Sequence, residues 1–205
     1  MAVGCCVTGP VGAAMVTAKR LLTDRLALVA AEPHHLIAEL VAPERLAQLL
    51  GASVGPDWPP GEYDRDAQAF FLARLIEGGP DVCGWFCWYA VRPAHGEQPA
   101  VAVGAGGYCG PPDDNGEVEI GFSILPAQRG QGYATELAHA LVGRAFAEPL
   151  VGAVVAHVGA ENGPSRKVLE KCGFACIGRD DESGNDRFLL TRDQGGSGRG
   201  GCLPK

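Results

Sequence analysis

The sequence predicts a single α/β domain built around a central mixed sheet, and three observations support this prediction. Residues 117–125 alternate apolar and polar side chains, which is typical of a half-buried strand. Residues 135–147 carry one apolar face at helical spacing, and residues 151–158 form a near-continuous apolar run, as in a strand buried on both faces. With 205 residues, 46% hydrophobic and 20% charged, the chain has the size and composition of one globular domain.

The elements of the N-terminal half follow from proline, glycine and apolar spacing. Residues 21–29 alternate as a first strand. Residues 33–40 and 43–50 each begin at a proline, which is favoured in the first turn of a helix, and Asp64 caps a third helix that ends near Gly78. The core stripe of this third helix is predicted to be Phe71, Leu72, Leu75 and Ile76.

The C-terminal half is predicted to add strands on both sides of the central one. Residues 85–91 and 100–108 form one expected hairpin, and residues 175–179 and 187–191 form another. Three glycines weaken the strand over 100–108, and they indicate a bulge or a close approach by another element. These glycines are Gly104, Gly106 and Gly107.

A glycine-rich turn, Arg129–Thr135, joins the central strand to the helix that follows it. A strand, a glycine turn and a helix N-terminus together place free backbone N–H groups at the positive end of a helix dipole. Because glycine lacks a Cβ atom, an anion can approach this backbone closely. We call Arg129–Thr135 the anion cup. A plain connection is the alternative, whereas the P-loop and dinucleotide patterns GxxxxGK[ST] and GxGxxG are absent from this turn.

Two motifs follow one another along the chain. The element R/Q-x-x-G-x-G/A is met by Arg129, Gly132 and Ala134, and the run N-x-x-S-x-x-x-L-x-x-x-G-F by Asn162, Ser165, Leu169, Gly173 and Phe174. Together these motifs resemble the GCN5-related N-acetyltransferase (GNAT) superfamily, and the second is most similar to the subgroup of ribosomal-protein N-terminal acetyltransferases. The resemblance implies one α+β domain whose mostly antiparallel sheet splays apart near residues 117–125 and carries helices on both faces.

The acetyltransferase domain is expected to span residues 21–193, between flexible tails at 1–20 and 194–205. The resemblance implies that acetyl-CoA donates its acetyl group by direct attack of a primary amine, which is a protein N-terminus or part of a small molecule. A catalytically inactive CoA-binding sensor or protein-interaction module is the alternative from another class. The acceptor stays open, because residues 32–80, which cover the acceptor side in the family, match no recognisable motif.

Glu119 and Ser165 are the candidate catalytic residues. A carboxylate in an apolar central strand is costly unless it has a task or a partner. The resemblance implies that Glu119 is a general base, directly or through water; the alternative is a structural pair, with Glu117 as the solvated glutamate. Ser165 falls at the third helical position if Asn162 caps the helix. The resemblance implies that Ser165 is a general acid for the leaving thiolate, and a serine bonded to the helix start is the alternative.

The resemblance also implies where acetyl-CoA binds. The backbone of Ile124 and Leu125 is expected to pair with the pantetheine amides, as one strand edge receives another. Asn162 is expected to cap its helix, to contact the pantetheine arm, or to do both. Gln131 stands where the family often has a lysine or arginine. The pyrophosphate is expected on the N–H groups of Arg129, Gly130, Gln131, Gly132, Tyr133, Ala134 and Thr135.

Composition excludes several other classes of function. The net charge of −7 argues against a nucleic-acid partner, and no apolar run has the length of a membrane span. The eight cysteines match neither a disulfide framework nor a zinc site, so we expect reduced thiols in a cytoplasmic protein without a metal. We also expect a monomer or a homodimer.

Two further residues leave their roles open in the sequence. His157 is most simply a core histidine with a partner, although a substrate role stays open. Trp58 fits a substrate-pocket residue and a packing anchor equally well.

Overall fold

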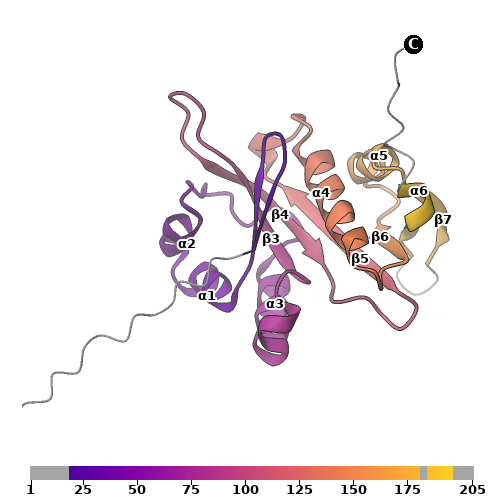
Figure 1. Cartoon of the computed structure of the whole chain (residues 1–205). Helices are drawn as coiled ribbons and strands as arrows, with labels where there is room; N and C mark the ends of the chain where they lie inside the picture. Colours follow the sequence, from indigo (N-terminus) through magenta and orange to yellow (C-terminus); the bar gives the residue numbers. More distant parts are fainter. Residues whose placement is uncertain (1–18, 181–183, 196–205) are drawn as a thin grey trace, which may run out of the picture.

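The computed structural model describes residues 19–180 and 184–195, which form one eight-stranded sheet in the order β1-β2-β3-β4-β5-β6-β8-β7 (Figure 1). Neighbouring strands are antiparallel except for β5 and β6, which are parallel. The predicted mixed, mostly antiparallel sheet is therefore confirmed. The strands are β1 (Arg20–Leu22), β2 (Ala27–Ala30), β3 (Cys87–Arg92), β4 (Val101–Tyr108), β5 (Glu117–Ile124), β6 (Ala153–Val158), β7 (Ala175–Arg179) and β8 (Asp186–Thr191).

The predicted helices are also present. Asp64 caps α3 through hydrogen bonds from the N–H groups of Asp66 and Ala67, both 3.0 Å long. The prediction that Ile76 belongs to the core stripe of α3 is wrong, because its side chain is 61% exposed, whereas the neighbouring Leu75 is buried. No helix of the described ranges is both long and apolar enough to cross a bilayer. The helices are α1 (Pro33–Val41), α2 (Pro43–Leu50), α3 (Arg65–Gly78), α4 (Tyr133–Ala147), α5 (Gly163–Lys171) and α6 (Arg192–Gly195), with short 3-10 turns η1 (Gly79–Val82) and η2 (Pro126–Gln128).

The first predicted strand is in fact a hairpin. The sequence predicts one strand over 21–29, but β1 and β2 are antiparallel neighbours, with Leu21 opposite Leu28. The turn between them closes on Thr23, whose backbone N–H donates to the Leu26 carbonyl and whose hydroxyl accepts from the Leu26 N–H, both at 2.9 Å. Such threonine turns compete with a continuous strand, and alternation does not distinguish the two because both arms of a hairpin alternate.

Two cores cover opposite faces of the sheet. One lies under α4 and α5 and includes Val118 and Ile120 of β5 together with Leu141. The other lies under α1, α2 and α3 and includes Leu36 and Tyr89. Because successive strand residues point to opposite faces, Glu119 lies on the face of the second core, away from α4.

The glycines of β4 allow close contact with both neighbouring strands. A Cβ atom at Gly104 would overlap the Ser123 carbonyl of β5, and one at Gly107 would overlap the Phe86 carbonyl before β3. The β3–β4 register also shifts between Ala90 and Val91. Both consequences predicted from these glycines, a bulge and a close approach, are therefore confirmed.

The only parallel pair of the described sheet is short. β5 and β6 share three residue pairs, which end at Glu119 opposite Val155. Beyond this point β5 continues to Ile124 paired with β4, while β6 continues to Val158 paired with β8. The sheet is therefore splayed between β5 and β6, as the family resemblance implies, and the gap begins at Glu119.

A buried carboxylate joins the elements that face the second core. Glu39 of α1 is 6% exposed and accepts hydrogen bonds from four donors. Burial raises the pKa of Glu39, and these hydrogen bonds act in the opposite direction. The cluster holds α1, α3, β3 and the loop before α3 together. The donors are Trp58 Nε1 at 2.5 Å, Tyr63 Oη at 2.7 Å, Gln68 Nε2 at 2.9 Å and Tyr89 Oη at 2.7 Å.

We expect Tyr89→Phe to lower the free energy of unfolding by about 1–3 kcal/mol, because it leaves a buried Glu39 oxygen with one donor fewer. Tyr108→Phe is the matched control, since the Tyr108 hydroxyl is equally buried but donates to a neutral carbonyl, that of Leu141, at 2.5 Å. Its expected loss is smaller, about 0.5–1.5 kcal/mol. Urea unfolding measures both losses, and a smaller loss for Tyr89→Phe than for Tyr108→Phe would contradict the ranking.

Candidate active site

Glu119 and His157 meet where β5 and β6 separate. The Glu119 Oε1 atom lies 2.9 Å from His157 Nδ1, and both side chains are partly exposed. The register explains the contact, because Glu119 pairs with Val155 and His157 lies two residues farther along β6 on the same face. His157 therefore has the predicted partner, which is the candidate base, but its side chain is partly exposed and does not lie in the core as predicted. His157 is the only polar residue in AVVAHV of β6, and this was the sequence signal.

Glu117, expected to be solvated, instead forms an ion pair. Its Oε2 atom accepts a hydrogen bond from Arg187 Nη2 of β8 at 2.6 Å. Arg187 is also the cross-strand neighbour of His157. The face beside the gap thus carries two carboxylates, a histidine and an arginine. In the described part of the chain, no group of three or more His, Cys, Asp or Glu side chains could hold a metal ion.

A cavity of about 170 Å³ adjoins this face. Its floor is formed by β4 and β5, including Gly121 and Ser123, and its wall by Tyr63 and Phe71. Gly121 and Ser123 follow Glu119 on the same face of β5. Cys109 also lines the cavity, and its N–H donates to the Glu119 carbonyl at 3.0 Å. The cavity therefore begins beside the candidate base.

The Cys109 thiol is held in its neutral form. Although Cys109 keeps part of its surface open to solvent, the surrounding protein and then the charge of Glu119 raise the pKa of its thiol to about 11. Because the thiolate is the nucleophile, at pH 8 only about one molecule in a thousand would carry a reactive sulfur here. The Cys109 thiol is therefore poorly suited to form an acyl-enzyme.

Trp58 lies away from this cavity. Its indole N–H is bonded to Glu39, and its ring packs edge-on against Tyr63 at a centroid distance of 6.2 Å. It lines a separate cavity of about 470 Å³ bounded by Pro43 and Arg65, and in the described chain it does not line the cavity beside Glu119. These contacts are those of a packing anchor.

The anion cup has free N–H groups at all of the predicted positions except Arg129. Gly130 and Gly132 have φ angles of 76° and 82°, a left-handed conformation that favours glycine. Within the described residues, the N–H groups of Gly130, Gln131 and Gly132 have no protein acceptor, and the first helical N–H donated within α4 is that of Glu136. Consecutive donors from Gly130 to Thr135 are therefore free, whereas the N–H of Arg129 is bonded to Pro126.

The backbone of β5 alternates between β4 and the gap. Leu125 donates its N–H to Val103 and accepts from Gln128, so both of its backbone groups are used within the protein. By the alternation of an antiparallel ladder, the backbone groups of Phe122 and Ile124 point the other way, into the gap. The Ile124 carbonyl accepts a hydrogen bond from Arg129 Nε at 3.0 Å, which leaves the Ile124 N–H facing the gap.

The start of α5 brings Asn162 and Ser165 together. The Asn162 side-chain oxygen accepts from the Ser165 N–H at 3.2 Å, which confirms the predicted cap and puts Ser165 at the third helical position. The cap uses only the oxygen of the Asn162 amide, so its NH2 group remains available to a ligand. Gly173, with a φ angle of 88°, follows the helix as predicted.

The sequence matches the family model described as an acetyltransferase (GNAT) domain over residues 25–175. The chain belongs to the GNAT family. It is also 30% identical over 154 residues to the uncharacterised N-acetyltransferase YjdG of Bacillus subtilis (strain 168), which covers 75% of this chain and 88% of the relative. This GNAT protein is thus an N-acetyltransferase, and the family uses acetyl-CoA.

Solved structures share the fold at low sequence identity. A candidate ribosomal-protein-serine acetyltransferase from Vibrio cholerae has a TM-score of 0.57 at 18% identity, with 86% of this chain and 99% of that chain covered. A GNAT-family acetyltransferase from Bacillus anthracis has a TM-score of 0.55 at 19% identity, covering 85% and 99%. The aminoglycoside acetyltransferase AAC(6')-Ib, solved with acetyl-CoA, has a TM-score of 0.58 at 19% identity, covering 87% and 100%. At these identities the likeness extends to the fold alone.

We expect Asn162→Ala to lower the free energy of unfolding by about 1 kcal/mol, because it removes the cap of α5. Asn162→Ser retains a capping oxygen, so its stability should stay within a few tenths of a kcal/mol of the parent, roughly. Urea unfolding of the two variants measures the difference. Equal stability of the alanine and serine variants would contradict the capping role of the Asn162 oxygen.

Proposed function

We propose that this GNAT enzyme transfers the acetyl group of acetyl-CoA to a primary amine that binds beside Glu119. The observation that carries the proposal is the gap between β5 and β6. The Glu119–His157 pair stands where the gap begins, and the anion cup follows the end of β5 where it is open. A long thioester with an anionic tail fits such a gap. Its thioester would lie near the Glu119–His157 pair, and its phosphates would lie at the anion cup.

Acetyl-CoA would be held mainly by backbone groups. The Ile124 N–H faces the gap and would pair with a pantetheine amide, while the free N–H groups of the anion cup, those of residues 130–135, would receive the pyrophosphate. The Asn162 NH2 group would contact the pantetheine arm, because the cap engages only the oxygen of this amide. The relative AAC(6')-Ib was solved with acetyl-CoA, which supports the same donor here.

Glu119 would remove a proton from the substrate ammonium, directly or through a water molecule. An amine attacks a thioester only after it has lost this proton, so a carboxylate beside the cavity fits the need. His157 would orient the carboxylate through the contact between Nδ1 and Oε1. The free amine would enter from the cavity lined by Gly121 and Ser123.

The amine nitrogen would then attack the thioester carbon directly. The new C–N bond forms a tetrahedral intermediate, which loses its N–H proton to a base and expels the CoA thiolate as the C–S bond breaks. The Ser165 hydroxyl at the start of α5 would supply the proton that the thiolate takes up, and solvent would restore it. The products are an acetamide and free CoA, and no covalent enzyme intermediate is formed.

The acceptor would be a cationic amine of a protein N-terminus or a small molecule. The net charge of −7 and the acidic side chains near the gap, Glu119 and Glu62, favour a cation over an anion. Two proteins of the same fold, the spermidine/spermine N-acetyltransferase SpeG of Vibrio cholerae and AAC(6')-Ib, carry amine-bearing compounds in their names or complexes. They support the chemical class and leave its identity open.

We expect Glu119→Gln to lower kcat by about 100-fold or more while leaving the Kd for acetyl-CoA within about twofold, since general-base catalysis contributes this much. Calorimetric titration with acetyl-CoA gives the Kd, and thiol release in the presence of an amine panel gives kcat. Glu117→Gln is the matched control, because Glu117 lies on the same strand and face but is paired with Arg187.

Four outcomes of this experiment would be decisive. Saturable binding of acetyl-CoA, with no binding of NAD or ATP, supports the proposed donor. Absence of acetyl-CoA binding to the parent protein would overturn the proposed function. Full turnover by Glu119→Gln would remove Glu119 as the base, and binding by the parent without turnover of any amine would favour an inactive CoA-binding module.

We expect Cys109→Ala to retain kcat within about twofold, because a thiol with a pKa of about 11 does not act as the nucleophile of neutral-pH acyl transfer. Steady-state kinetics with acetyl-CoA measure this, and mass spectrometry of the parent enzyme mixed with acetyl-CoA alone should show no added acetyl group. An acetylated Cys109, or loss of activity in Cys109→Ala, would contradict direct attack.

A further inference from the structure

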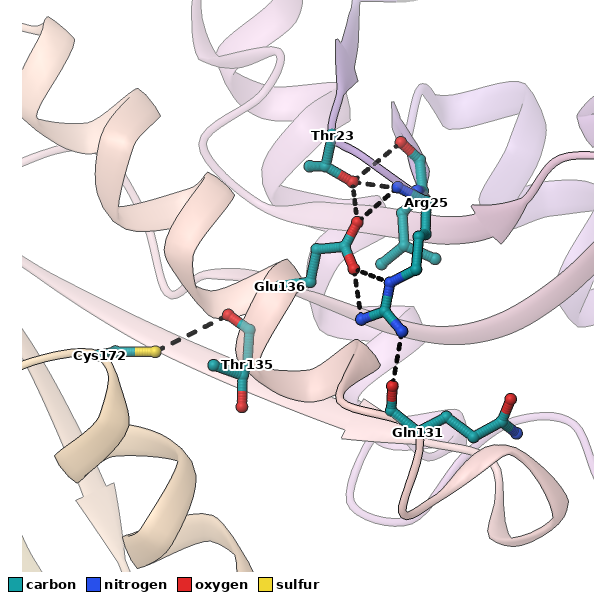
Figure 2. A network of polar contacts seen from close by, with 7 residues as sticks. Thr23, Arg25, Gln131, Thr135, Glu136 and Cys172 are labelled. Carbon is teal, nitrogen blue, oxygen red and sulfur yellow. Dashed lines mark hydrogen bonds and ion pairs between the residues drawn. The ribbon is translucent and has the colours of Figure 1, made fainter.

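The turn between β1 and β2 is fixed to the first turn of α4, directly behind the anion cup. Figure 2 shows Glu136 of α4 between Thr23 and Arg25 of this turn. The Thr23 hydroxyl donates to Glu136 Oε1 at 2.5 Å, and the Arg25 backbone N–H donates to the same oxygen at 2.7 Å. The guanidinium of Arg25 binds Glu136 Oε2 twice, through Nε at 2.7 Å and Nη2 at 2.6 Å.

This contact differs from an ordinary surface ion pair. The Glu136 side chain is only 14% exposed, and three groups of a distant segment converge on it. Burial alone would raise the pKa of Glu136, but the hydrogen bonds from Thr23 and Arg25 outweigh it, so the pKa lies below its ordinary value. The carboxylate is therefore ionised and fixed at neutral pH.

Arg25 reaches one step farther, into the anion cup. Its Nη1 atom donates to the Gln131 carbonyl at 2.7 Å, as Figure 2 shows. A trans peptide bond holds the carbonyl and the following N–H in opposite directions. Since the Gln131 carbonyl points toward Arg25, the N–H of Gly132 points away from Arg25 and toward the open side of the cup. Arg25 thus fixes the direction of one anion-binding donor.

The guanidinium also packs closely against the residues that follow. It lies over the Tyr133 ring with its carbon 5.0 Å from the ring centroid. A Cβ atom at Gly132 would come within 3.2 Å of Arg25 Nη2, so the loop has glycine where the guanidinium passes. One planar group therefore contacts Glu136, Gln131 and Tyr133 at once, which a lysine ammonium does not reproduce.

We propose that Arg25 is a positioning residue that holds the anion cup in the shape that binds the pyrophosphate of acetyl-CoA. The proposal rests on the proposed function. Arg25 does not touch the phosphates in this account, because it lies on the carbonyl side of the loop. It keeps the Gly132 N–H pointed at them, with Glu136 and Thr23 holding the guanidinium in place.

The test compares two acetyl donors in the full-length Arg25→Gln variant. Acetyl-CoA has the pyrophosphate, and S-acetylpantetheine lacks every phosphate. We expect the Kd for acetyl-CoA to rise about tenfold, because a charge-assisted hydrogen bond loses its alignment. The kcat/KM with S-acetylpantetheine should stay within about twofold of the parent, since this donor does not use the cup.

A second variant separates the shape of the Arg25 side chain from its charge, and a third variant is the control. Arg25→Lys keeps the charge but not the planar fork, so we expect it to bind acetyl-CoA nearly as weakly as Arg25→Gln. Arg74→Gln is the matched control, because Arg74 also pairs with a glutamate, Glu77, and lies over a ring, Phe70, but on α3. We expect Arg74→Gln to leave both donors unaffected.

Several results would overturn the proposal. They are an unchanged Kd for acetyl-CoA in Arg25→Gln, full affinity in Arg25→Lys, or an equal loss with S-acetylpantetheine, which would indicate general damage to the fold. Should Arg25→Gln fail to fold, Arg25→Lys and Glu136→Gln carry the same comparison. Absence of acetyl-CoA binding to the parent protein is a different result, and it would overturn the proposed function itself.

Discussion

The separation of β5 from β6 is the constraint on which the rest of the structure depends. A strand in the middle of a sheet normally has both edges hydrogen-bonded, and unpaired backbone groups inside a protein are costly. Beyond Glu119, β5 is paired with β4 alone, so the backbone of Phe122 and Ile124 faces a gap. A ligand with amide groups satisfies such an edge by taking the place of a strand. The splay therefore provides both room and hydrogen-bonding groups.

The gap is stable because each strand has a full partner on its other side. β6 pairs along its whole length with β8, and β5 pairs with β4 from Ile120 to Ile124. The glycines of β4 permit this second pairing, since a side chain at Gly104 or Gly106 would overlap β5. Gly121 is different, because a Cβ atom there would meet no neighbour and would only fill space in the cavity. The glycines of β4 are therefore explained by close packing against β5. At Gly121 the missing side chain instead leaves space in the cavity.

How much could be predicted from the sequence depended on whether a feature is local. The extent of β5 to within one residue, the cap of α5 by Asn162 and the glycine turn between β5 and α4 follow from neighbouring residues, and all three were predicted. The contact of Glu119 with His157 depends on the register of two parallel strands, which the sequence does not contain. The break at Thr23 was missed because a hairpin and a strand share the same alternation.

The same distinction explains why Arg25 was not recognised as a site residue. Its contacts join segments more than a hundred residues apart, and no spacing rule relates Thr23 to Glu136. The contacts of Arg25 also bear on the charge available to the cup. Gln131 carries no charge, and the nearby side chains of Arg25, Arg129 and Arg166 are engaged within the protein.

Under the proposed function, an acidic protein must therefore bind a polyanion largely through backbone dipoles. Arg25 is bonded to Glu136, Arg129 to the Ile124 carbonyl, and Arg166 of α5 to Asp186. The strength of a backbone N–H as an anion donor depends steeply on its direction, whereas that of a mobile lysine does not. A cup without its own lysine thus depends more on the exact orientation of each peptide. This dependence is the physical reason why a residue behind the loop can control an anion in front of it.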